Sequence, residues 1–279
     1  MTSPTTAYID GSQMLYRAEY GFPSRIVSRA GHDITGLFGF LALTRKALLQ
    51  SPHRPTHAVV VFDADAPVPR ARIDARYKSF RRLAPAGDPH NPFRHLPWIT
   101  RALQVWGVIH IEHEHAEADD VIATLVDRGR AAGHEALVVS SDRDFHQLLE
   151  DGVSQWNSSR GRPEGWITPE SVIARYGVHP RQWCDYVALV GDRADAMPGI
   201  RGVGPVTARR ILRDGRTLNT AEEELTAPQL RDALRQRELH RLERHVLLQP
   251  PEPSALPQGG LLSAAEVLEA LGLWDCPYP

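Results

Sequence analysis

The sequence predicts an α/β fold, with a mainly parallel central sheet flanked by helices. Short apolar runs rich in β-branched residues alternate with longer stretches that carry apolar residues at helical spacing, a pattern typical of parallel strands joined by helices. The 279 residues are 42% apolar, which is enough to bury a substantial core. Several apolar runs lead to a carboxylate, so acidic side chains are expected where strands end.

Strands and helices can be placed in order along the first half of the chain. The expected strands are residues 7–9, 58–62, 108–111 and 136–139. The expected helices are residues 37–49, 98–106, 118–126 and 145–149. Further on, Thr220 with Glu223 forms a capping-box pattern that predicts a helix start, and Ser263 with Glu266 forms another.

Nine carboxylates fall into five clusters along the chain. Ligands bind beyond the carboxyl ends of parallel strands, so these acids are expected to converge. Two bare carboxylates about 4 Å apart repel by about 4 kcal/mol at an effective dielectric of about 20, so a converged set requires cations. Such oxygen-rich sites suit Mg²⁺ or Mn²⁺, and two such ions in one pocket cleave phosphodiesters. The clusters are Asp10; Asp63; Glu117, Asp119 and Asp120; Asp142 and Asp144; and Asp192 and Asp195.

Each cluster taken alone has an ordinary explanation. Carboxylates at the start of a helix act as caps and interact well with the helix dipole. In a helix over residues 118–126 the apolar side chains share one face, which leaves Glu117, Asp119 and Asp120 away from the core. Three acids in four positions exceed what capping needs, and the five clusters together favour a metal site.

The histidines before this helix raise the alternative of a zinc site. On a strand His113 and His115 would share a face that His110 does not, and no cysteine lies near them. They are therefore expected to be surface residues.

The charge distribution favours a nucleic-acid partner although the net charge is −2. Setting aside the nine clustered acids leaves 25 of the 34 acidic residues against 32 basic ones, a surplus of seven positive charges elsewhere. A run of charge is usually only a solvated face, but these runs flank the acidic clusters. The basic residues concentrate in Arg70, Arg72, Arg76, Lys78, Arg81 and Arg82, and in Arg201, Arg209, Arg210, Arg213 and Arg216.

The sequence also indicates a cytoplasmic location. Its first residues lack a basic region followed by an apolar run, and no stretch approaches the roughly 18 apolar residues needed to span a bilayer, so no membrane association is expected. Cys184 and Cys276 lie far apart in sequence and are expected to be free thiols in a reducing compartment, with a single disulfide as the alternative.

A glycine-rich stretch follows the last acidic cluster. Gly199, Gly202 and Gly204 allow a tight loop, and the helix expected after it would offer free backbone N–H groups that can cradle a phosphate. By itself such a stretch is as well explained by a simple turn before a helix.

At this point the chain resembles the 5′-nucleases, the family of the 5′→3′ exonuclease domain of bacterial DNA polymerase I and the flap endonucleases. The resemblance covers about residues 8–212, in a bacterial form expected to stand alone because no polymerase region follows. The matching motifs run in order from Ile9-Asp10-Gly11-Ser12 and Leu15-Tyr16-Arg17-Ala18, through Val61-Phe62-Asp63-Ala64 and Tyr77-Lys78-Ser79-Phe80-Arg81, to Glu117-Ala118-Asp119-Asp120, Asp142-Arg143-Asp144, Gly191-Asp192-Arg193-Ala194-Asp195 and Gly202-Val203-Gly204-Pro205-Val206-Thr207-Ala208.

The resemblance implies a PIN-like nuclease core, a helical arch and a helix-three-turn-helix region that grips duplex DNA. We expect the core with its arch (about 70–100) over residues 1–180, the duplex-binding region over 181–248, and a Pro- and Gly-rich connection with a last helix over 249–279. The first metal would lie among Asp10, Asp63, Glu117, Asp119 and Asp120, and the second among Asp142, Asp144, Asp192 and Asp195. Two or three Mg²⁺ or Mn²⁺ ions are implied, with K⁺ at the glycine-rich hairpin.

The resemblance also assigns roles to residues outside the acidic clusters. Tyr77, Lys78 and Arg81 would act at the base of the arch, where Lys78 and Arg81 can reach one phosphate and the Tyr77 ring can stack on a base. Arg17 and Arg70 match basic positions of the family, and the ordinary alternative for each is a surface ion pair. The duplex contacts would come from Gly202, Gly204, Thr207 and Arg209.

The chain departs from the family pattern at two points of its second half. Pro205 and Val206 stand where the hairpin usually has Glu-Lys, which puts one phosphate contact in doubt. Ala196 stands where Asn is common, so the packing near the second metal is expected to differ.

The expected function is that of a structure-selective 5′→3′ exonuclease and flap endonuclease, a monomer acting on 5′ flaps and on nicked, gapped or 5′-ended duplex DNA in replication and repair at the nucleoid. One alternative is a PIN-type ribonuclease, which would usually manage with fewer acids and lack the glycine hairpin. The other is a non-catalytic protein that binds branched DNA, which the intact second metal group argues against.

Overall fold

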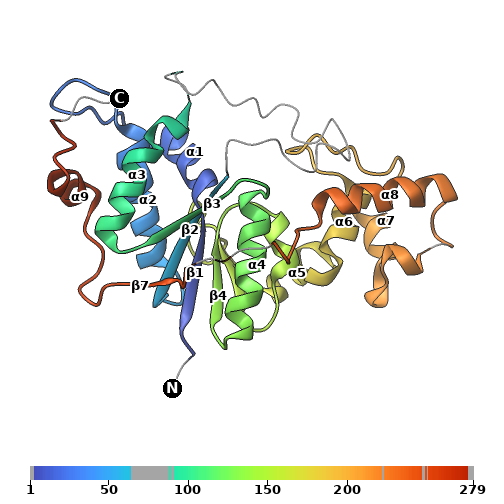
Figure 1. Cartoon of the computed structure of the whole chain (residues 1–279). Coiled ribbons are helices and arrows are strands. Elements are labelled where there is room, and N and C mark those ends of the chain that lie inside the picture. The colour runs from blue at the N-terminus through green and yellow to red at the C-terminus, as the bar shows by residue number, and fades with distance from the viewer. Residues whose placement is uncertain are drawn as a thin grey trace.

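The computed structural model describes residues 3–63, 88, 91–221, 223–246, 249 and 251–275, and it contains a seven-stranded sheet in the order β3-β2-β1-β4-β5-β6, with β7 beside β2 (Figure 1). Strands β3 to β5 of this order pair in parallel, and β6 and β7 add antiparallel edges. The predicted mainly parallel sheet is confirmed. Its strands are β1 (Thr5–Asp10), β2 (His57–Asp63), β3 (Ile109–His113), β4 (Glu135–Val139), β5 (Val153–Trp156), β6 (Trp166–Ile167) and β7 (Ser254–Ala255).

Helices connect the strands and extend the chain beyond the sheet. The α-helices are α1 (Gly11–Gly21), α2 (Thr35–Gln50), α3 (Leu96–Trp106), α4 (Ala118–Ala131), α5 (Pro169–Tyr176), α6 (Trp183–Val190), α7 (Pro205–Ile211), α8 (Ala227–His240) and α9 (Ala264–Ala270). The short 3-10 helices are η2 (Pro92–His95), η3 (Asp144–Leu148), η4 (Pro180–Gln182), η5 (Arg213–Gly215) and η6 (Leu218–Thr220).

Two of the predicted helical segments differ from the structure. Residues 145–149 form most of a 3-10 helix, η3, instead of an α-helix. The prediction that Thr220 starts a helix is wrong, because α8 begins at Ala227 behind a capping box of Thr226 and Gln229. The box at Ser263 does start α9, as predicted.

The sheet is buried on both faces, and the strand residues alternate between two apolar clusters. Tyr8 of β1 packs with α4 residues such as Val121, whereas Ile9 packs with α2 residues such as Phe40. Figure 1 shows α1, α2 and α3 on one side of the sheet and α4 on the other, with α6, α7 and α8 beyond α4. Both faces are apolar, so polar side chains are directed to the strand ends.

The strand register brings the predicted acidic residues to one edge. Asp10 pairs with Val61, two residues before Asp63, and Ile9 pairs with Val139, the last residue of β4. The carboxyl ends of β1, β2 and β4 therefore lie side by side.

No helix within the described residues combines the length and apolarity needed to cross a membrane.

Gly11 lets α1 pass close to β2. A Cβ atom at this position would lie 2.7 Å from both Phe62 Cε1 and Val60 Cγ1. Because such overpacking typically costs about 1–3 kcal/mol, Gly11→Ala should lower the free energy of unfolding by about that amount in urea denaturation.

Gly21 at the other end of α1 is the matched control. An added Cβ there would meet only Arg17 Cγ, at 3.7 Å. Gly21→Ala should be neutral or stabilise by up to about 1 kcal/mol, and equal losses for the two variants would contradict the close-approach explanation.

Candidate metal centre

Asp10 ends β1 and caps α1, and both of its oxygens accept hydrogen bonds. Oδ1 accepts from the Gln13 N–H at 2.9 Å, and Oδ2 accepts from the Ser140 hydroxyl at 2.8 Å. The Ser140 hydroxyl also accepts the Asp142 N–H at 3.0 Å. A single hydroxyl group thus connects the carboxylate of β1 with the turn that follows β4.

Asp63 fixes the start of α4 against β2. Its Oδ1 accepts the Ala118 N–H at 2.8 Å, and its own N–H donates to Ser12 Oγ at 2.8 Å. Ala118 lies between Glu117, the N-cap residue, and Asp119 in the first turn. This hydrogen bond therefore brings the acids of α4 to the carboxyl end of β2.

Asp142 and Asp144 lie in the turn after β4. The Asp144 N–H donates to Asp142 Oδ1 at 2.9 Å, and the buried Gln155 side chain donates to the Asp142 carbonyl at 2.6 Å. Arg143, between the two acids, extends instead to Asp192, where Nη2 lies 2.7 Å from Oδ2. The turn after β4 is thereby connected to the loop after α6.

Asp192 and Asp195 lie in that loop, which closes on itself. Asp192 and Met197 exchange backbone hydrogen bonds of 2.9 and 2.8 Å, and Asp192 Oδ1 accepts the Ala194 N–H at 2.8 Å. Asp195 is buried, and its carboxylate belongs to a group with Asp144 and His240 whose ligand atoms lie within 4.8 Å of one another. The last two acidic clusters of the sequence therefore meet.

The loop geometry depends on two glycines that approach closely. Gly191 and Gly199 have φ values of 84° and 68°. A Cβ at Gly191 would lie 2.6 Å from the Met197 carbonyl oxygen, and one at Gly199 would lie 2.5 Å from the Gly191 nitrogen. Side chains at these two positions would open the loop that holds Asp192 and Asp195.

The electrostatics reflect the gathering of these acids. Burial, together with the nearby charges of Asp63 and Asp142, raises the pKa of Asp10 from 3.8 to about 7. Burial alone would lower the pKa of His240, but its hydrogen bond with Asp144 and the charges of Asp144, Asp195 and Asp192 raise it. The pocket thus favours positive charge.

Hydrogen bonds and an ion pair connect β1 to the β4 turn, β2 to α4, and the β4 turn to the α6 loop. The charge of Asp63 also acts on Asp10, so all five acidic clusters are linked. Carboxylate oxygens are the preferred ligands of hard divalent ions, and the raised pKa of Asp10 indicates a charge that a cation would relieve. The donor set therefore fits hard divalent metal ions. The residues that could hold them are Asp10, Asp63, Glu117, Asp119, Asp120, Asp142, Asp144, Asp192 and Asp195.

The other sequence-predicted site residues lie in different places. Tyr77, Lys78, Arg81 and Arg70 fall outside the described residues, as does most of the predicted arch. Arg17 on α1 is half-buried and donates to Ser158 Oγ at 2.8 Å.

The predicted duplex-binding residues form a loop and helix. Gly202 and Gly204 are exposed before α7, which carries a half-buried Thr207 and an exposed Arg209. The loop and helix predicted from the glycines are therefore present.

His110, His113 and His115 lie apart from the group of possible metal ligands that the described residues contain. That group consists of Asp144, Asp195 and His240.

Sequence reasoning missed Ser140 and His240. Ser140 had a usable signal, because a hydroxyl residue between a predicted strand and an Asp-x-Asp turn lies where it can bond two acids at once. His240 had none, since it reaches Asp144 from 96 residues away in the sequence.

Ala196 adopts a backbone conformation that asparagine tolerates better than alanine. Its φ is 63°, in the left-handed region, which costs a residue with a Cβ roughly 1–2 kcal/mol. Ala196→Gly should therefore raise the free energy of unfolding by up to about 1 kcal/mol in urea denaturation. Ala194→Gly, in the same loop but outside the left-handed region, should lower it. A loss at both positions would contradict the strain at Ala196.

Asp10 should make the stability of the metal-free protein depend on pH. Its pKa rises from 3.8 to about 7 on folding, so the stability conferred by its bound proton is complete below about pH 4 and is lost as the pH rises through about 7. In urea denaturation with chelator, the free energy of unfolding of Asp10→Asn relative to wild type should rise between about pH 4 and 7. Above this range the difference should stay constant.

Asp232→Asn is the control for this titration, because Asp232 is exposed on α8. Its difference from wild type should not follow the same curve. A difference between Asp10→Asn and wild type that is constant with pH would show that Asp10 ionises normally.

Comparison with known protein families covers most of the chain. Residues 5–177 match the family model described as "5'-3' exonuclease, N-terminal resolvase-like domain", and residues 178–249 match "5'-3' exonuclease, C-terminal SAM fold". The likeness thus extends past residue 212, where the sequence resemblance alone had faded.

Curated relatives agree with these matches. The "5'-3' exonuclease" of Aquifex aeolicus is 38% identical over 209 residues, covering 75% of this chain and 69% of that protein. The "DNA polymerase I, thermostable" of Thermus thermophilus is 35% identical over 229 residues. The match covers 81% of this chain but only 26% of the polymerase, so the chain spans about a quarter of that protein's length.

Solved structures share the fold at lower identity. The T5 D15 protein co-crystallised with metal ions aligns with a TM-score of 0.67 and 17% identity, covering 86% of this chain and 90% of that one. The catalytic core of Rad2 in complex with DNA substrate aligns with a TM-score of 0.53 and 14% identity, covering 98% and 93%. With its PIN-like core and two consecutive family matches, the chain belongs to the 5′-3′ exonuclease family.

Proposed function

We propose that the protein is a structure-selective 5′→3′ exonuclease and flap endonuclease that hydrolyses DNA phosphodiesters with divalent metal ions and leaves 5′-phosphate products. The contacts that link the five acidic segments carry this proposal: the Ser140 hydrogen bonds, the Asp63 bond to α4 and the Arg143–Asp192 ion pair. Family membership supports it, as does the fold shared with the T5 protein, solved with metal ions, and with Rad2, solved with DNA.

The carboxylates divide into two groups with separate supports. Asp10 and Asp63 end strands, and Glu117, Asp119 and Asp120 join them at the start of α4. Asp142, Asp144, Asp192 and Asp195 form the second group, held by the turn after β4 and the loop after α6. Two or three Mg²⁺ or Mn²⁺ ions bound there would activate a water molecule and stabilise the charge that develops on the scissile phosphate.

The chain's own residues orient this site before any ion binds. The hydrogen bonds of Asp10 from Gln13 and Ser140 fix its rotamer, and Asp63 is fixed by the Ala118 N–H. Preorganised oxygens need no rearrangement during the reaction. This preorganisation supplies most of the rate enhancement at such sites.

We further propose that the second half of the chain binds the duplex backbone. Gly202, Gly204, Thr207 and Arg209 would contact phosphates, with K⁺ at the same hairpin, and Arg17 and Arg70 would contact phosphates nearer the acids. Tyr77, Lys78 and Arg81 would act on the 5′-terminal nucleotide. The boundary between the two family matches supports a division near residue 180, with 1–180, 181–248 and 249–279 as the regions.

The test compares cleavage of 5′-labelled flap DNA with that of matched single strands and RNA, in Mn²⁺ or in chelator. A protein with both Asp120→Asn and Asp144→Asn should lose more than about 100-fold of the wild-type rate, because even indirect partners of a metal are worth 10–100-fold. Asp232→Asn, on the exposed face of α8, should cleave normally.

Thermal unfolding gives a second readout of the same site. Mn²⁺ should raise the melting temperature of the wild type and not of the double variant, since the ion binds only the folded pocket. Cleavage in chelator, or an unimpaired double variant, would refute the mechanism, and a preference for RNA would favour a ribonuclease.

A further inference from the structure

The segment that follows α8 lies back along α4. Residues 240–246, called here the return segment, contact Asp120, Thr124 and Asp127, which share one face of α4 at helical spacing. The Glu243 N–H donates to Asp120 Oδ1 at 2.8 Å, and the Val246 N–H donates to Thr124 Oγ1 at 3.1 Å. Arg244 forms a two-point ion pair with Asp127, in which Nε lies 2.7 Å from Oδ2. The return segment is thus bonded to an acid of the first group.

The start of the return segment reaches the second group. His240 is fully buried, and its Nδ1 lies 3.4 Å from Asp144 Oδ1 and 3.5 Å from Oδ2. Asp195 shares this group of ligand atoms. One short segment therefore touches carboxylates of both groups.

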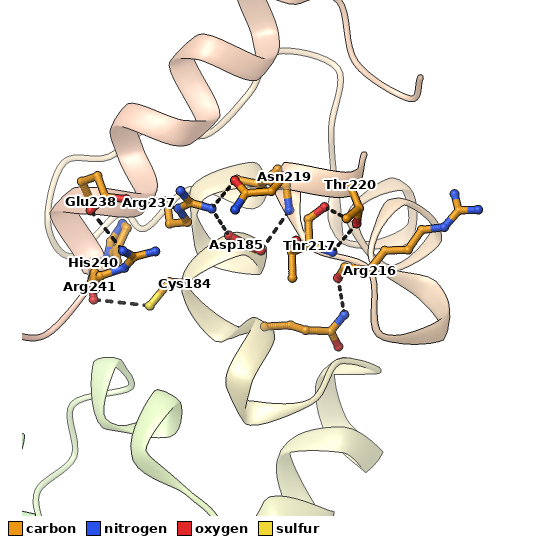
Figure 2. A network of polar contacts seen from close by, with 12 residues as sticks. Cys184, Asp185, Arg216, Thr217, Asn219, Thr220, Arg237, Glu238, His240 and Arg241 are labelled. Atoms are coloured by element: carbon orange, nitrogen blue, oxygen red, sulfur yellow. Dashed lines mark hydrogen bonds and ion pairs between the residues drawn. The ribbon is translucent and has the colours of Figure 1, made fainter. Parts of the chain in front are cut away.

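Three hydrogen bonds hold the backbone around His240 in place. Its carbonyl accepts hydrogen bonds from Gln147 Nε2 at 2.8 Å and from the Cys184 thiol at 3.7 Å. The Leu242 N–H donates to Gln147 Oε1 at 3.0 Å. Figure 2 shows Cys184 beside the end of α8, and Asp185 of α6 facing Arg237 one turn earlier. Arg237 Nη1 lies 3.6 Å from Asp185 Oδ1. These contacts fix the backbone from which the His240 ring reaches Asp144.

Core packing alone does not account for a histidine here. Nε2 of His240 is buried and has no hydrogen-bond partner among the described residues. Burying an unsatisfied polar atom costs roughly 1–3 kcal/mol, which a leucine of similar size would avoid. The contact between Nδ1 and the Asp144 carboxylate therefore explains why a histidine occupies this position.

We propose that His240 is a positioning residue for metal binding: its Nδ1 donates to the Asp144 carboxylate and holds it toward Asp195, while the Glu243 N–H of the same segment holds Asp120. This inference rests on the proposed function, because it assigns a role at the same site. It also implies that a shift of α8, which belongs to the proposed duplex-binding region, would move contacts to both carboxylate groups.

The test uses substitutions of His240 that keep or remove the donor. Asn places an amide nitrogen near the position of Nδ1, Gln places one near Nε2, and Leu offers none. Calorimetric titration of Mn²⁺ into the full chain should show binding about 10–100-fold weaker for His240→Leu, with affinity largely restored in His240→Asn and not in His240→Gln. The Mn²⁺ concentration for half-maximal flap cleavage should follow the same order.

Leu239→Val is the control for lost packing at the end of α8, since Leu239 is buried beside His240. It should lower the melting temperature in chelator and leave Mn²⁺ affinity unchanged. Should His240→Leu fail to fold, the comparison of Asn with Gln decides, because both side chains are polar and differ only in where the nitrogen lies.

Failure of this inference can be told apart from failure of the proposed function. Wild-type Mn²⁺ affinity in His240→Leu, or equal losses in the Asn and Gln variants, would overturn the positioning role even if flap DNA is cut. If the wild type binds Mn²⁺ with the expected order of variants but cuts no DNA, the nuclease proposal fails and the role of His240 at the metal centre stands.

Discussion

Mutual repulsion between buried carboxylates is the constraint on which the rest of this structure depends. Asp10 and Asp63 end neighbouring strands, and Asp10 shows the consequence, since burial and the charges of Asp63 and Asp142 raise its pKa to about 7. Such groups would separate unless the backbone held them. Hydrogen bonds from different elements hold three of them: Asp10 accepts from Gln13 and Ser140, Asp63 from the Ala118 N–H, and Asp192 from the Ala194 N–H.

The same constraint explains why the fold is built as it is. Parallel strands place several chain ends at one edge without any of them being near in sequence, and both faces of the sheet remain free for apolar packing. The helices beyond α4 then close the site from the side. Arg143 and His240 reach across this boundary to Asp192 and Asp144. The two family matches meet near residue 177, and the acids of the second group lie on both sides of that boundary.

Much of the fold and most of the acidic site could be predicted from the sequence, because they follow local rules. The periodicity of apolar residues marks the alternating strands and helices. The acids at strand ends directly follow these apolar runs in the sequence. The predicted start of α8 was wrong because Thr220 and Thr226 both offer capping patterns. Pro228 fits only the first turn of a helix, and a helix that began after Thr220 would carry this proline in its interior. Pro228 therefore favours a helix start after Thr226.

Other features could not have been predicted. The approach of His240 to Asp144 depends on how the return segment folds back, and no spacing or composition encodes a contact between residues 96 positions apart. Gln147 of η3 donates to the His240 carbonyl, 93 residues away, and no local pattern predicts this tertiary contact. Roles assigned to Lys78, Arg81 and Tyr77 stay predictions, since these residues lie outside the described part of the chain.

The central place of β1 in the sheet has a consequence for how the protein matures on the ribosome. Thr5 must wait for Glu135 before its second ladder can form, and Asp120 must wait for Glu243. Contacts of such high sequence separation form late and slowly. The acidic site of the nascent chain therefore stays incomplete until Glu243 has been synthesised and has left the ribosome, so synthesis itself delays the appearance of a competent centre.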